Sequence, residues 1–369
     1  MTIEPGSSVL TTAPGNALIE PGSTIGIIGG GQLGRMLALA AASMGYRVHV
    51  FAPEAELPAG DVAAEVTRAG YDDHAALDGF AAAVDVVTFE FENIATAAIA
   101  RVAQNVAVHP SARSLEVAQD RAVEKAFVEA LGGRPAAWAI VDNRADLDAA
   151  IAAIGCPAVL KTRRLGYDGK GQARLHAPGD ADVAWEAIAG QPAILEAFVP
   201  FTHEFSVLLA RGQDGELVTW DVPHNSHRNG ILDTSRVPAP PEVALHAWDA
   251  IALAVRVAEA LDHVGVLALE FFATPQGPRF NEMAPRVHNS GHWTIEGARA
   301  SQFENHIRAV CGLPLGSTEL AAPDVLMKNL LGEDVHDWQR LLADRRAHLH
   351  LYGKSEVKPG RKMGHVTWL

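Results

Sequence analysis

Apolar runs alternate with helical patterns over the first part of the chain. Segments 24–30, 46–52 and 82–93 each contain an apolar run and predict strands. Between the first two, segment 32–44 repeats apolar residues at the spacing of one helical face, and Gly45 is the expected C-cap. Strands that alternate with helices predict a parallel sheet, and such sheets bind ligands at the carboxyl ends of their strands.

The pattern changes in the middle of the chain. Segment 115–135 has the period of one helix and ends at two glycines and a proline. Three apolar segments around the glycine-rich loop 163–172 predict short strands: 156–162, 173–176 and 192–201. From Glu204 onward the strands become longer and antiparallel in pattern, and one long helix is predicted over 245–261.

Composition narrows the class of protein. The length of 369 residues suggests two or three domains, and 48% hydrophobic residues can supply their cores. A formal net charge of −14 lacks the basic footprint of a nucleic-acid-binding protein, so no nucleic-acid partner is expected. Every apolar run falls short of the ~18 residues of a membrane span, so no membrane partner is expected either.

The cysteines and the N-terminus bear on the compartment. Cys156 and Cys311 predict two free thiols in a reducing environment, and the protein is expected to be cytoplasmic. Segment 1–22 is rich in Gly, Pro, Ser and Thr and lacks the features of a secretory signal. It is predicted to be a disordered extension.

The segment GIIGGGQLG contains the pattern G-x-G-x-x-G at Gly29, Gly31 and Gly34, directly after the first predicted strand. A dinucleotide-binding protein would also need an acid at the end of the second strand, to hold a ribose hydroxyl. The first acid there is Glu54, which lies beyond the apolar run, so the pattern is incomplete. We expect the loop to bind another ligand, with Gln32 as a specific contact and the helix N-terminus favouring an anionic group.

The strongest chemical signal is segment 266–293, which predicts a hairpin with its turn at TPQG. Glu270 and Glu282 lie symmetrically about Gln276, so a regular hairpin would oppose two carboxylates that repel each other. A hard cation between them removes the repulsion, and Mg²⁺ shared with nucleotide phosphates is the usual ion. Asn281 adds an oxygen ligand, although strict alternation would point it to the other face. The alternative is two solvated acids on an exposed hairpin.

Hydrogen-bond donors are dense directly after this hairpin. They lie within seven residues: Arg286, His288, Asn289, Ser290 and His292. Such density fits a site for a polyanion. Two histidines four apart without the pattern H-E-x-x-H are a weak zinc signal, so no zinc is expected.

Lys161 lies on a short predicted strand and precedes the loop 163–172. Gly166, Gly169 and Gly171 make this loop mobile and rich in backbone N–H donors that could cover phosphates. It is not a Walker A loop, because the pattern G-x-x-x-x-G-K-[ST] is absent. The alternative is an ordinary flexible surface loop.

Two further segments could bind parts of a nucleotide. Segment 195–200, LEAFVP, could offer backbone groups to an adenine, and Glu204 could take ribose hydroxyls. The tail 352–365 gathers basic residues in an acidic protein: Lys354, Lys358, Arg361 and Lys362. The tail predicts a local patch for a phosphate, and the alternative is a solvated run of charges.

Together these motifs resemble the ATP-grasp superfamily, on the combination of Lys161, GYDGKGQ, LEAFV, Glu204, Glu270 and Asn281-Glu282. Five segments narrow the resemblance to the N5-carboxyaminoimidazole ribonucleotide synthase family: GGGQLGRM, GYDGKGQ, PHNSHRNGIL, NEMAPRVHNSGHWT and VKPGRKMGH. The resemblance runs in order from Thr24 to the C-terminus. The extension before Thr24 has no counterpart, and the chain stops at Leu369 where the family usually continues through a further helix.

The resemblance implies an α/β fold in three parts. These are an N-terminal Rossmann-like (pre-ATP-grasp) domain, a small lid domain, and a larger C-terminal α+β domain that clamps ATP against the lid. After the extension 1–22, the expected boundaries are 23–121, 122–204 and 205–369, with the basic tail in the last domain.

The resemblance also implies the activity of an ATP-dependent ligase in purine biosynthesis. ATP would phosphorylate bicarbonate to carboxyphosphate. The amine of 5-aminoimidazole ribonucleotide would then capture the carboxyl group, giving the N5-carbamate, ADP and phosphate. The implied cofactors are ATP and Mg²⁺, the implied partners are these small molecules, and the implied assembly is a homodimer.

Site residues follow from the same resemblance. Mg²⁺ would be held by Glu270 and Glu282. ATP would be contacted by Arg121, Lys161, Gly166, Tyr167, Asp168, Gly169, Lys170, Gly171, Gln172, Glu196, Phe198, Val199, Glu204, His227, Asn281 and Glu282. The ribonucleotide would be contacted by Gln32, Leu33, Glu90, Tyr167, Asp168, Arg286, Lys354 and Arg361.

Three of these residues would be catalytic: Asp168, Arg286 and Lys354. Asp168 would orient or deprotonate the amine, and the planar fork of Arg286 would clamp bicarbonate or carboxyphosphate. The alternative for Asp168 is that it only shapes the turn of its loop, since Asp-Gly is a common turn pair.

Three other functions compete with this interpretation of the sequence. A formate-dependent glycinamide ribonucleotide transformylase shares the architecture but favours a Glu where this chain has Gln32. A biotin carboxylase also activates bicarbonate but is usually longer. A non-catalytic nucleotide-binding regulator is the third, and the intact set of Lys161, Glu270 and Glu282 argues against it.

Overall fold

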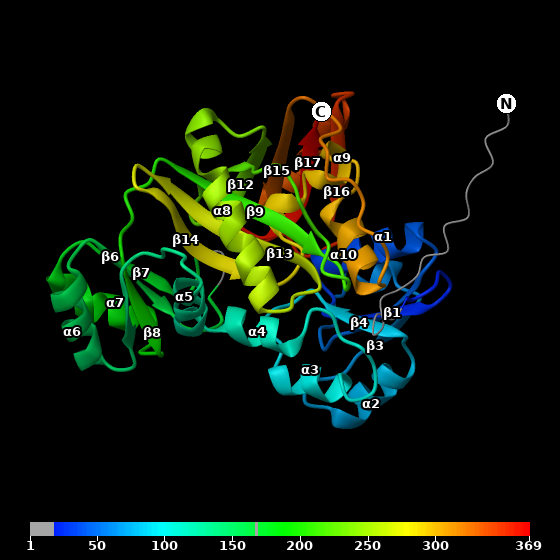
Figure 1. Ribbon diagram of the computed structural model, residues 1–369, viewed down its shortest axis with the longest axis horizontal. Coiled ribbons are helices and arrows are strands. Elements are labelled where there is room, and N and C mark those ends of the chain that lie inside the picture. The colour runs from blue at the N-terminus through cyan, green and yellow to red at the C-terminus, as the bar shows by residue number, and fades with distance from the viewer. Residues whose placement is uncertain (1–17, 167–168) are drawn as a thin grey trace.

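The computed structural model describes residues 18–166 and 169–369, whose backbone forms three β-sheets in chain order (Figure 1). A parallel sheet comes from the N-terminal part, and a small antiparallel sheet comes from the middle. A nine-stranded antiparallel sheet comes from the rest of the described chain. Helices accompany all three sheets, which is the α/β class that the sequence predicts.

The N-terminal sheet has the strand order β3-β2-β1-β4 and is parallel throughout, as the alternating pattern predicts. Its strands are β1 (Thr24–Ile28), β2 (Arg47–Phe51), β3 (Glu65–Thr67) and β4 (Val86–Phe89). Its helices are α1 (Gln32–Ser43), α2 (His74–Ala82) and α3 (Thr96–Val102). Gly45 has a φ of 85°, the left-handed conformation expected just after a helix. Because β1 and β4 are neighbours, the loop after β1 and Glu90 after β4 meet at one edge.

The helix predicted over 115–135 is wrong as a single element. The structure has two helices, α4 (Ala112–Gln119) and α5 (Arg121–Ala130), separated at Asp120. Asp120 has an extended backbone and its Oδ1 accepts hydrogen bonds from the amides of Ala122 and Val123, which makes it the N-cap of α5. The capping carboxylate therefore interrupts a helical pattern that the apolar residues alone would carry through.

The middle sheet has the order β5-β8-β6-β7 with antiparallel neighbours. Its strands are β5 (Trp138–Val141), β6 (Ala158–Thr162), β7 (Gln172–Leu175) and β8 (Ala193–Ala197). Helices α6 (Arg144–Ile154) and α7 (Ala181–Ala187) bury its apolar residues in a core of their own. In Figure 1 this unit lies apart from the N-terminal sheet, on the other side of α4 and α5.

The large sheet follows the path β14-β13-β9-β11-β12-β15-β17-β16, and β10 pairs with β9. Its strands are β9 (His203–Arg211), β10 (Leu217–Thr219), β11 (His224–Arg228), β12 (Ile231–Val237), β13 (Gly265–Thr274), β14 (Gly277–Ala284), β15 (Val325–Leu331), β16 (Ala347–Leu351) and β17 (Lys362–Trp368). Its helices are α8 (Pro241–Ala260), α9 (Thr294–Gly297), α10 (Gln302–Val310) and α11 (Trp338–Leu342). The long helix α8 begins four residues before the predicted one, because Pro241 suits the first turn.

The two faces of the large sheet bury different partners. Leu269 and Phe271 of β13 pack in the core that α8 covers. Val266 and Ala268 pack in a second core, which contains residues of both α10 and α1. Because successive strand residues point to opposite faces, Glu270 lies on the face shared with the N-terminal sheet. One continuous core therefore joins the first and last parts of the fold behind Glu270.

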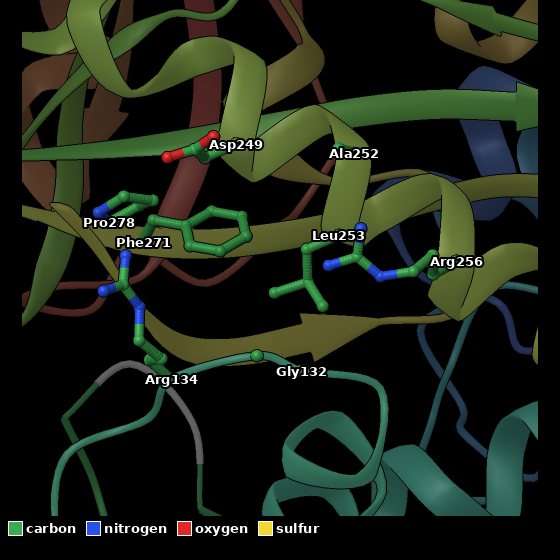
Figure 2. A pocket seen from close by; sticks show the side chains of 9 residues that line it. Gly132, Arg134, Asp249, Ala252, Leu253, Arg256, Phe271 and Pro278 are labelled. Carbon is green, nitrogen blue, oxygen red and sulfur yellow. The ribbon is translucent and has the colours of Figure 1, made fainter.

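A pocket of about 230 Å³ opens on the opposite face, between α8 and the hairpin β13–β14 (Figure 2). Leu253 and Phe271 form its apolar floor, and the side chains of Arg134, Asp249 and Arg256 lie around it. Phe271 follows Glu270 directly, so this pocket lies across the sheet from Glu270. It contains none of the residues that the sequence assigns to a site.

The described part of the predicted N-terminal extension packs against the fold. The amide of Ile19 donates to the carbonyl of Cys311 at 2.9 Å, and the hydroxyl of Tyr46 donates to the carbonyl of Ile19 at 2.7 Å. Residues 1–17 lie outside the described residues. Cys156 and Cys311 are both free thiols, as predicted. No helix within residues 18–166 and 169–369 combines the length and apolar character needed to cross a membrane.

Candidate functional site

The hairpin β13–β14 carries the predicted acids on a β-bulge rather than on a regular ladder. Leu269 pairs with Met283 and Phe271 pairs with Phe280, so Glu270 alone opposes both Asn281 and Glu282. A bulge places two residues of one strand against one residue of the other. This corrects the regular hairpin and the expectation that Asn281 points away, because the side chain of Asn281 also reaches the site.

Two elements, α5 and β6, bring cations to this bulge. Arg121, the first residue of α5, donates from Nη1 to Glu282 Oε2 at 2.7 Å. Lys161 on β6 lies 3.0 Å from Glu196 Oε2 and 3.3 Å from Asn281 Oδ1. Burial opposes ionisation of Glu282, but the charges of Arg121 and Lys161 outweigh it and lower its pKa to about 2. Glu282 is therefore ionised at neutral pH, although its burial opposes the negative charge.

Glu270 differs from Glu282. Burial, followed by repulsion from Glu282, raises the pKa of Glu270 to about 7. His288 Nε2 lies 3.5 Å from Glu270 Oε1, but burial and the positive charge of Arg286 lower the pKa of His288 to about 3. Neutral His288 cannot balance the second carboxylate. The bulge thus presents two opposed acids, and a cation bound between them would favour the charged form of Glu270.

Lys125 is a residue of the site that no sequence motif predicts. It lies on α5, its side chain is wholly buried, and its Nζ lies 3.0 Å from the carbonyl oxygen of Asn281 and 3.1 Å from Glu196 Oε1. The available signal was its place four residues after Arg121, on the same helical face. Burial opposes ionisation of Glu196, but Lys161 and Lys125 outweigh it and lower its pKa to about 2.

Segment 195–200, which is predicted to contact adenine, contains Glu196 and crosses the end of β8. The Glu196 carboxylate is engaged by the two lysines, so its side chain is not open to a base. The amide of Phe198 donates to the carbonyl of Pro157 at 3.0 Å, whereas the residue as a whole is 41% exposed. The ring of Phe198 is therefore open to a base, and Val199, the next residue, is partly exposed.

Glu204 and His227 form a pair on adjacent strands of the large sheet. His227 Nδ1 lies 3.0 Å from Glu204 Oε2. Burial opposes a charge on His227, but Glu204 and Glu270 outweigh it and raise its pKa. The negative charge of Glu270 acts on His227, which connects this pair electrostatically to the bulge.

The glycine-rich loop between β6 and β7 approaches two neighbours closely. A Cβ atom on Gly171 would lie 2.5 Å from Thr162 Oγ1. A Cβ atom on Gly230, in the turn between β11 and β12, would lie 3.1 Å from Gly169 Cα. Gly166, Lys170 and Gln172 also lie in or beside this loop, and the Cα of Gln172 pairs with that of Lys161. The predicted residues Tyr167 and Asp168 lie outside the described residues.

The loop after β1 meets the end of β4. The amide of Gly31 donates to Glu90 Oε1 at 2.6 Å, and Gln32 begins α1 with partial exposure. Burial raises the pKa of Glu90 against the opposing effects of the Gly31 amide and Arg286. Leu33 is packed in the core, so any ligand contact at this residue would come from its backbone.

Arg286 bridges this edge and the hairpin. It follows β14, and its Nη2 lies 2.9 Å from Glu92 Oε2, just after β4. Its Nη1 donates to the carbonyl of Val287 at 3.0 Å. The Arg286 Nε is buried and finds no hydrogen-bond partner among residues 18–166 and 169–369. Glu92 is a further acid at this edge, for which the sequence motifs predict no role.

The basic tail reaches the same region and is partly engaged. Lys354 Nζ donates to the carbonyl of Lys362 at 2.8 Å, and burial with Arg361 and Lys362 lowers the pKa of Lys354 to about 8. Arg361 Nη2 lies 2.8 Å from Glu56 Oε2, and the amide of Ser355 donates to the other oxygen of Glu56. Glu56 was missed because about 300 residues separate it from the tail in sequence, which leaves no local signal.

The residues at the bulge fit a nucleotide with its metal ion. Glu270, Glu282 and the amide oxygen of Asn281 are the hard oxygen ligands that Mg²⁺ prefers. Within the described residues, no group of three or more His, Cys, Asp or Glu side chains is arranged to hold a metal ion by itself. Such a site suits an ion that takes its remaining ligands from phosphate oxygens, with Arg121 and Lys161 beside them.

Three family models match the chain in succession. The ribonucleotide synthetase preATP-grasp domain matches residues 23–119. The ATP-grasp domain matches residues 126–303, and the phosphoribosylaminoimidazole carboxylase C-terminal domain matches residues 325–369.

Relatives and solved structures agree with these models. The N5-carboxyaminoimidazole ribonucleotide synthase of Brucella melitensis is 50% identical over 352 residues, covering 95% of this chain and 97% of the relative. A crystal structure of an N5-carboxyaminoimidazole ribonucleotide synthetase in an ADP complex has a TM-score of 0.91 and 44% identity, covering 96% and 94% of the two chains. The N5-carboxyaminoimidazole synthase of Aspergillus clavatus, in complex with ADP and 5-aminoimidazole ribonucleotide, has a TM-score of 0.87 and 30% identity, covering 94% and 93%.

None of these matches favours a glycinamide ribonucleotide transformylase, a biotin carboxylase or a regulator. The matched domains follow one another in the order that the sequence resemblance implies. Identity at 50% over almost the whole length of both proteins, together with this order, shows that the chain belongs to the N5-carboxyaminoimidazole ribonucleotide synthase family of ATP-grasp ligases.

Proposed function

We propose that this chain carboxylates 5-aminoimidazole ribonucleotide with bicarbonate and ATP, giving N5-carboxyaminoimidazole ribonucleotide, ADP and phosphate. The observation that carries the proposal is the convergence of Arg121, Lys161 and Glu282 on one bulge of the hairpin. Phosphoryl transfer depends on positioning and charge neutralisation more than on covalent help from the protein. These residues supply both.

On this proposal, Mg·ATP binds between the middle sheet and the large sheet. Glu270 and Glu282 hold Mg²⁺, which when bound neutralises charge on the phosphate oxygens. The guanidinium of Arg121 and the ammonium of Lys161 contact the same phosphates. Phe198 and Val199 receive the base, and Glu204 with His227 receives the ribose side of the nucleotide.

The ribonucleotide takes the opposite edge, where β1 and β4 end. Gln32, the Leu33 amide and Glu90 face it from the N-terminal sheet, while Lys354 and Arg361 contribute positive charge for its phosphate. Arg286 lies between the two halves, since it contacts Glu92 after β4 and follows the bulge strand. Its planar guanidinium suits bicarbonate or carboxyphosphate. Asp168 stays a prediction for the residue that orients or deprotonates the amine.

The proposal extends to the state of the protein in the cell. A homodimer is implied by the family resemblance, and a cytoplasmic location is the expectation from the two cysteines and the N-terminal sequence. Sedimentation equilibrium at micromolar concentration tests the first, and a monomer at every concentration would reject it. Cell fractionation with an antibody against the native chain tests the second.

The decisive experiment measures ADP release from Mg·ATP and bicarbonate, with and without 5-aminoimidazole ribonucleotide. Strong stimulation by this ribonucleotide is expected. ADP release that requires glycinamide ribonucleotide and formate would keep the fold assignment and reject the substrate. Absence of ADP release under every condition would favour a nucleotide-binding regulator.

A further inference from the structure

A buried histidine links the two halves of the candidate site. His306 on α10 accepts a hydrogen bond at Nδ1 from the amide of Val266, at 3.0 Å. Its other ring nitrogen, Nε2, lies 2.8 Å from Thr88 Oγ1. Because Nδ1 accepts from an amide, the ring proton belongs on Nε2, and Nε2–H donates to the threonine hydroxyl. Both side chains are wholly buried.

The two partners of His306 lie on the strands that carry the two halves. Thr88 is on β4, two residues before Glu90, at the edge proposed for the ribonucleotide. Val266 is on β13, four residues before Glu270, at the bulge proposed for Mg·ATP. Even spacings keep each pair on one face of its strand. The imidazole is therefore a short connection between the N-terminal sheet and the large sheet.

The residues around His306 and Thr88 are those expected of a specific buried hydrogen bond. The other residues of β4 are Val86, Val87 and Phe89, so Thr88 is a polar group in an apolar, fully buried strand. A buried hydroxyl or imidazole is costly unless it is hydrogen-bonded. Gly265 gives the ring its room, because a Cβ atom there would lie 2.9 Å from His306 Cε1.

We propose that His306, acting through Thr88, is a positioning residue that sets the ribonucleotide edge relative to the phosphoryl-transfer bulge. The inference rests on the proposed function, since it assigns the two strand ends to two substrates. Arg286, the residue proposed to bind bicarbonate or carboxyphosphate, contacts Glu92 beyond β4. A shift of β4 would therefore move both the edge proposed for the ribonucleotide and the carboxylate that holds Arg286. Arg121 and Lys161 lie on α5 and β6, so the nucleotide contacts that they provide stay in place.

The chain offers a matched control on the same interface. Ser114 Oγ on α4 lies 3.1 Å from His263 Nδ1, and His263 Nε2 lies 3.0 Å from the carbonyl of Val266. This second buried hydroxyl–imidazole pair also meets β13 at Val266, and Ser114 and His263 are wholly buried. Ser114, however, is not on a strand that ends at the site. Removing either hydroxyl leaves one ring nitrogen unpaired, so the two losses in stability should be similar.

The test compares Thr88→Val, Thr88→Ser and Ser114→Ala in the full chain with Mg·ATP, bicarbonate and 5-aminoimidazole ribonucleotide. For Thr88→Val we expect the KM for the ribonucleotide to rise about fivefold or more, on the scale of one lost hydrogen bond. We expect more than one ADP released per N5-carboxylated product and an unchanged KM for ATP. Thr88→Ser should restore coupling, and Ser114→Ala should match Thr88→Val in thermal stability while keeping wild-type kinetics.

Each remaining outcome has a distinct meaning. If Thr88→Val keeps the wild-type KM and one ADP per product, or if Ser114→Ala uncouples to the same extent, the positioning role of His306 is rejected. If the wild-type chain releases no ADP in response to the ribonucleotide, the proposed function itself fails. The wild-type measurement therefore separates failure of the reaction from failure of the positioning role.

Discussion

The ammonium of Lys125 lies 3.0 Å from the backbone carbonyl oxygen of Asn281, at the bulge that brings Asn281 and Glu282 to the same side. The lysine is completely buried and forms an ion pair with Glu196. Glu196 also forms an ion pair with Lys161. One cation thus contacts both the irregular backbone of β14 and Glu196, which pairs with Lys161, a residue proposed to contact ATP. Lys125 therefore supports residues proposed to contact ATP without being proposed to contact it.

Replacing Lys125 with Met should impair nucleotide binding. The variant loses the group that fixes the bulge carbonyl and leaves Lys161 as the remaining lysine on Glu196. A buried carbonyl without a partner costs about 1–3 kcal/mol of stability. We expect the KM for ATP to rise by about tenfold, with a smaller change in the KM for the ribonucleotide. Steady-state kinetics and urea unfolding measure both effects, and an unchanged KM for ATP in a destabilised variant would make Lys125 purely structural.

Gly230 should matter for ATP binding through the glycine-rich loop. Asn229 and Gly230 have φ values of 54° and 77°, as in the tight turn of a two-residue hairpin. A Cβ atom on Gly230 would approach Gly169 Cα to 3.1 Å. Gly230→Ala should push the loop away from its seat on this turn and raise the KM for ATP severalfold, as measured by ADP release.

The control for Gly230→Ala separates crowding from backbone strain. Gly215 also has a positive φ, 89°, but the nearest atom to its Cβ position is Arg211 Nη2 at 3.6 Å. Gly215→Ala should cost about 1 kcal/mol of stability and leave the KM for ATP unchanged. Equal kinetics for both variants would show that the loop does not depend on the close approach at Gly230.

Asp120 should couple helix stability to the position of Arg121. Its carboxylate caps α5 and also accepts from Arg163 Nη2 at 2.8 Å, while Arg121 is the next residue. Asp120→Ala should remove the cap, at a cost of about 0.5–2 kcal/mol, and should lower ATP-dependent turnover because Arg121 loses its fixed start of the helix. Thermal unfolding and ADP release measure the two effects.

A second N-cap serves as the control. Asp73 caps α2, where its Oδ1 accepts from the amide of Ala76 at 3.0 Å, away from the candidate site. Asp73→Ala should lose similar stability while turnover stays at the wild-type level. A comparable fall in turnover for Asp73→Ala would mean that general loss of stability, rather than misplacement of Arg121, explains the result for Asp120.

Local sequence patterns predicted helices and strands correctly where the periodicity depends on residues close together in the sequence. The run before Gly29 and the helical face after Gln32 correctly predicted β1 and α1, since both periods are set by nearest neighbours in sequence. The break at Asp120 was missed because its apolar neighbours keep the helical period on both sides. In the sequence, an aspartate that caps a helix cannot be distinguished from one in the middle of a helix. The difference lies in the backbone conformation.

Tertiary contacts account for what the sequence could not predict in the site. The opposed acids Glu270 and Glu282 were found by counting from a turn, but the bulge that admits Asn281 has no signature in an alternating pattern. Lys125 and Glu56 are ordinary charged residues by composition. They become part of the site only when α5 packs on β14 and when the tail meets the loop after β2.

The buried histidine His263 should make stability depend on pH in a predictable direction. Burial is the main cause that lowers its pKa to about 4, and the nearby groups Arg211 and His109 act in the same direction. In the unfolded chain an ordinary histidine has a pKa near 6.5, so the unfolded state binds a proton at a pH where the folded state does not. Stability from neutral His263 is therefore fully present above about pH 6.5 and is lost as the pH falls towards 4.

A variant isolates this effect from the other titrating groups. Glu270 and Glu124 have raised pKa values of about 7 and about 8, so they act in the opposite direction, but they do so in both proteins and cancel in a difference. The stability cost of His263→Asn should be largest at pH 7.5 and should shrink below pH 6.5 by up to ~1.4 kcal/mol per pH unit. Urea unfolding of both proteins between pH 7.5 and 5 measures this difference. A cost that stays constant over that range would mean that the folded chain protonates His263 as readily as the unfolded chain does.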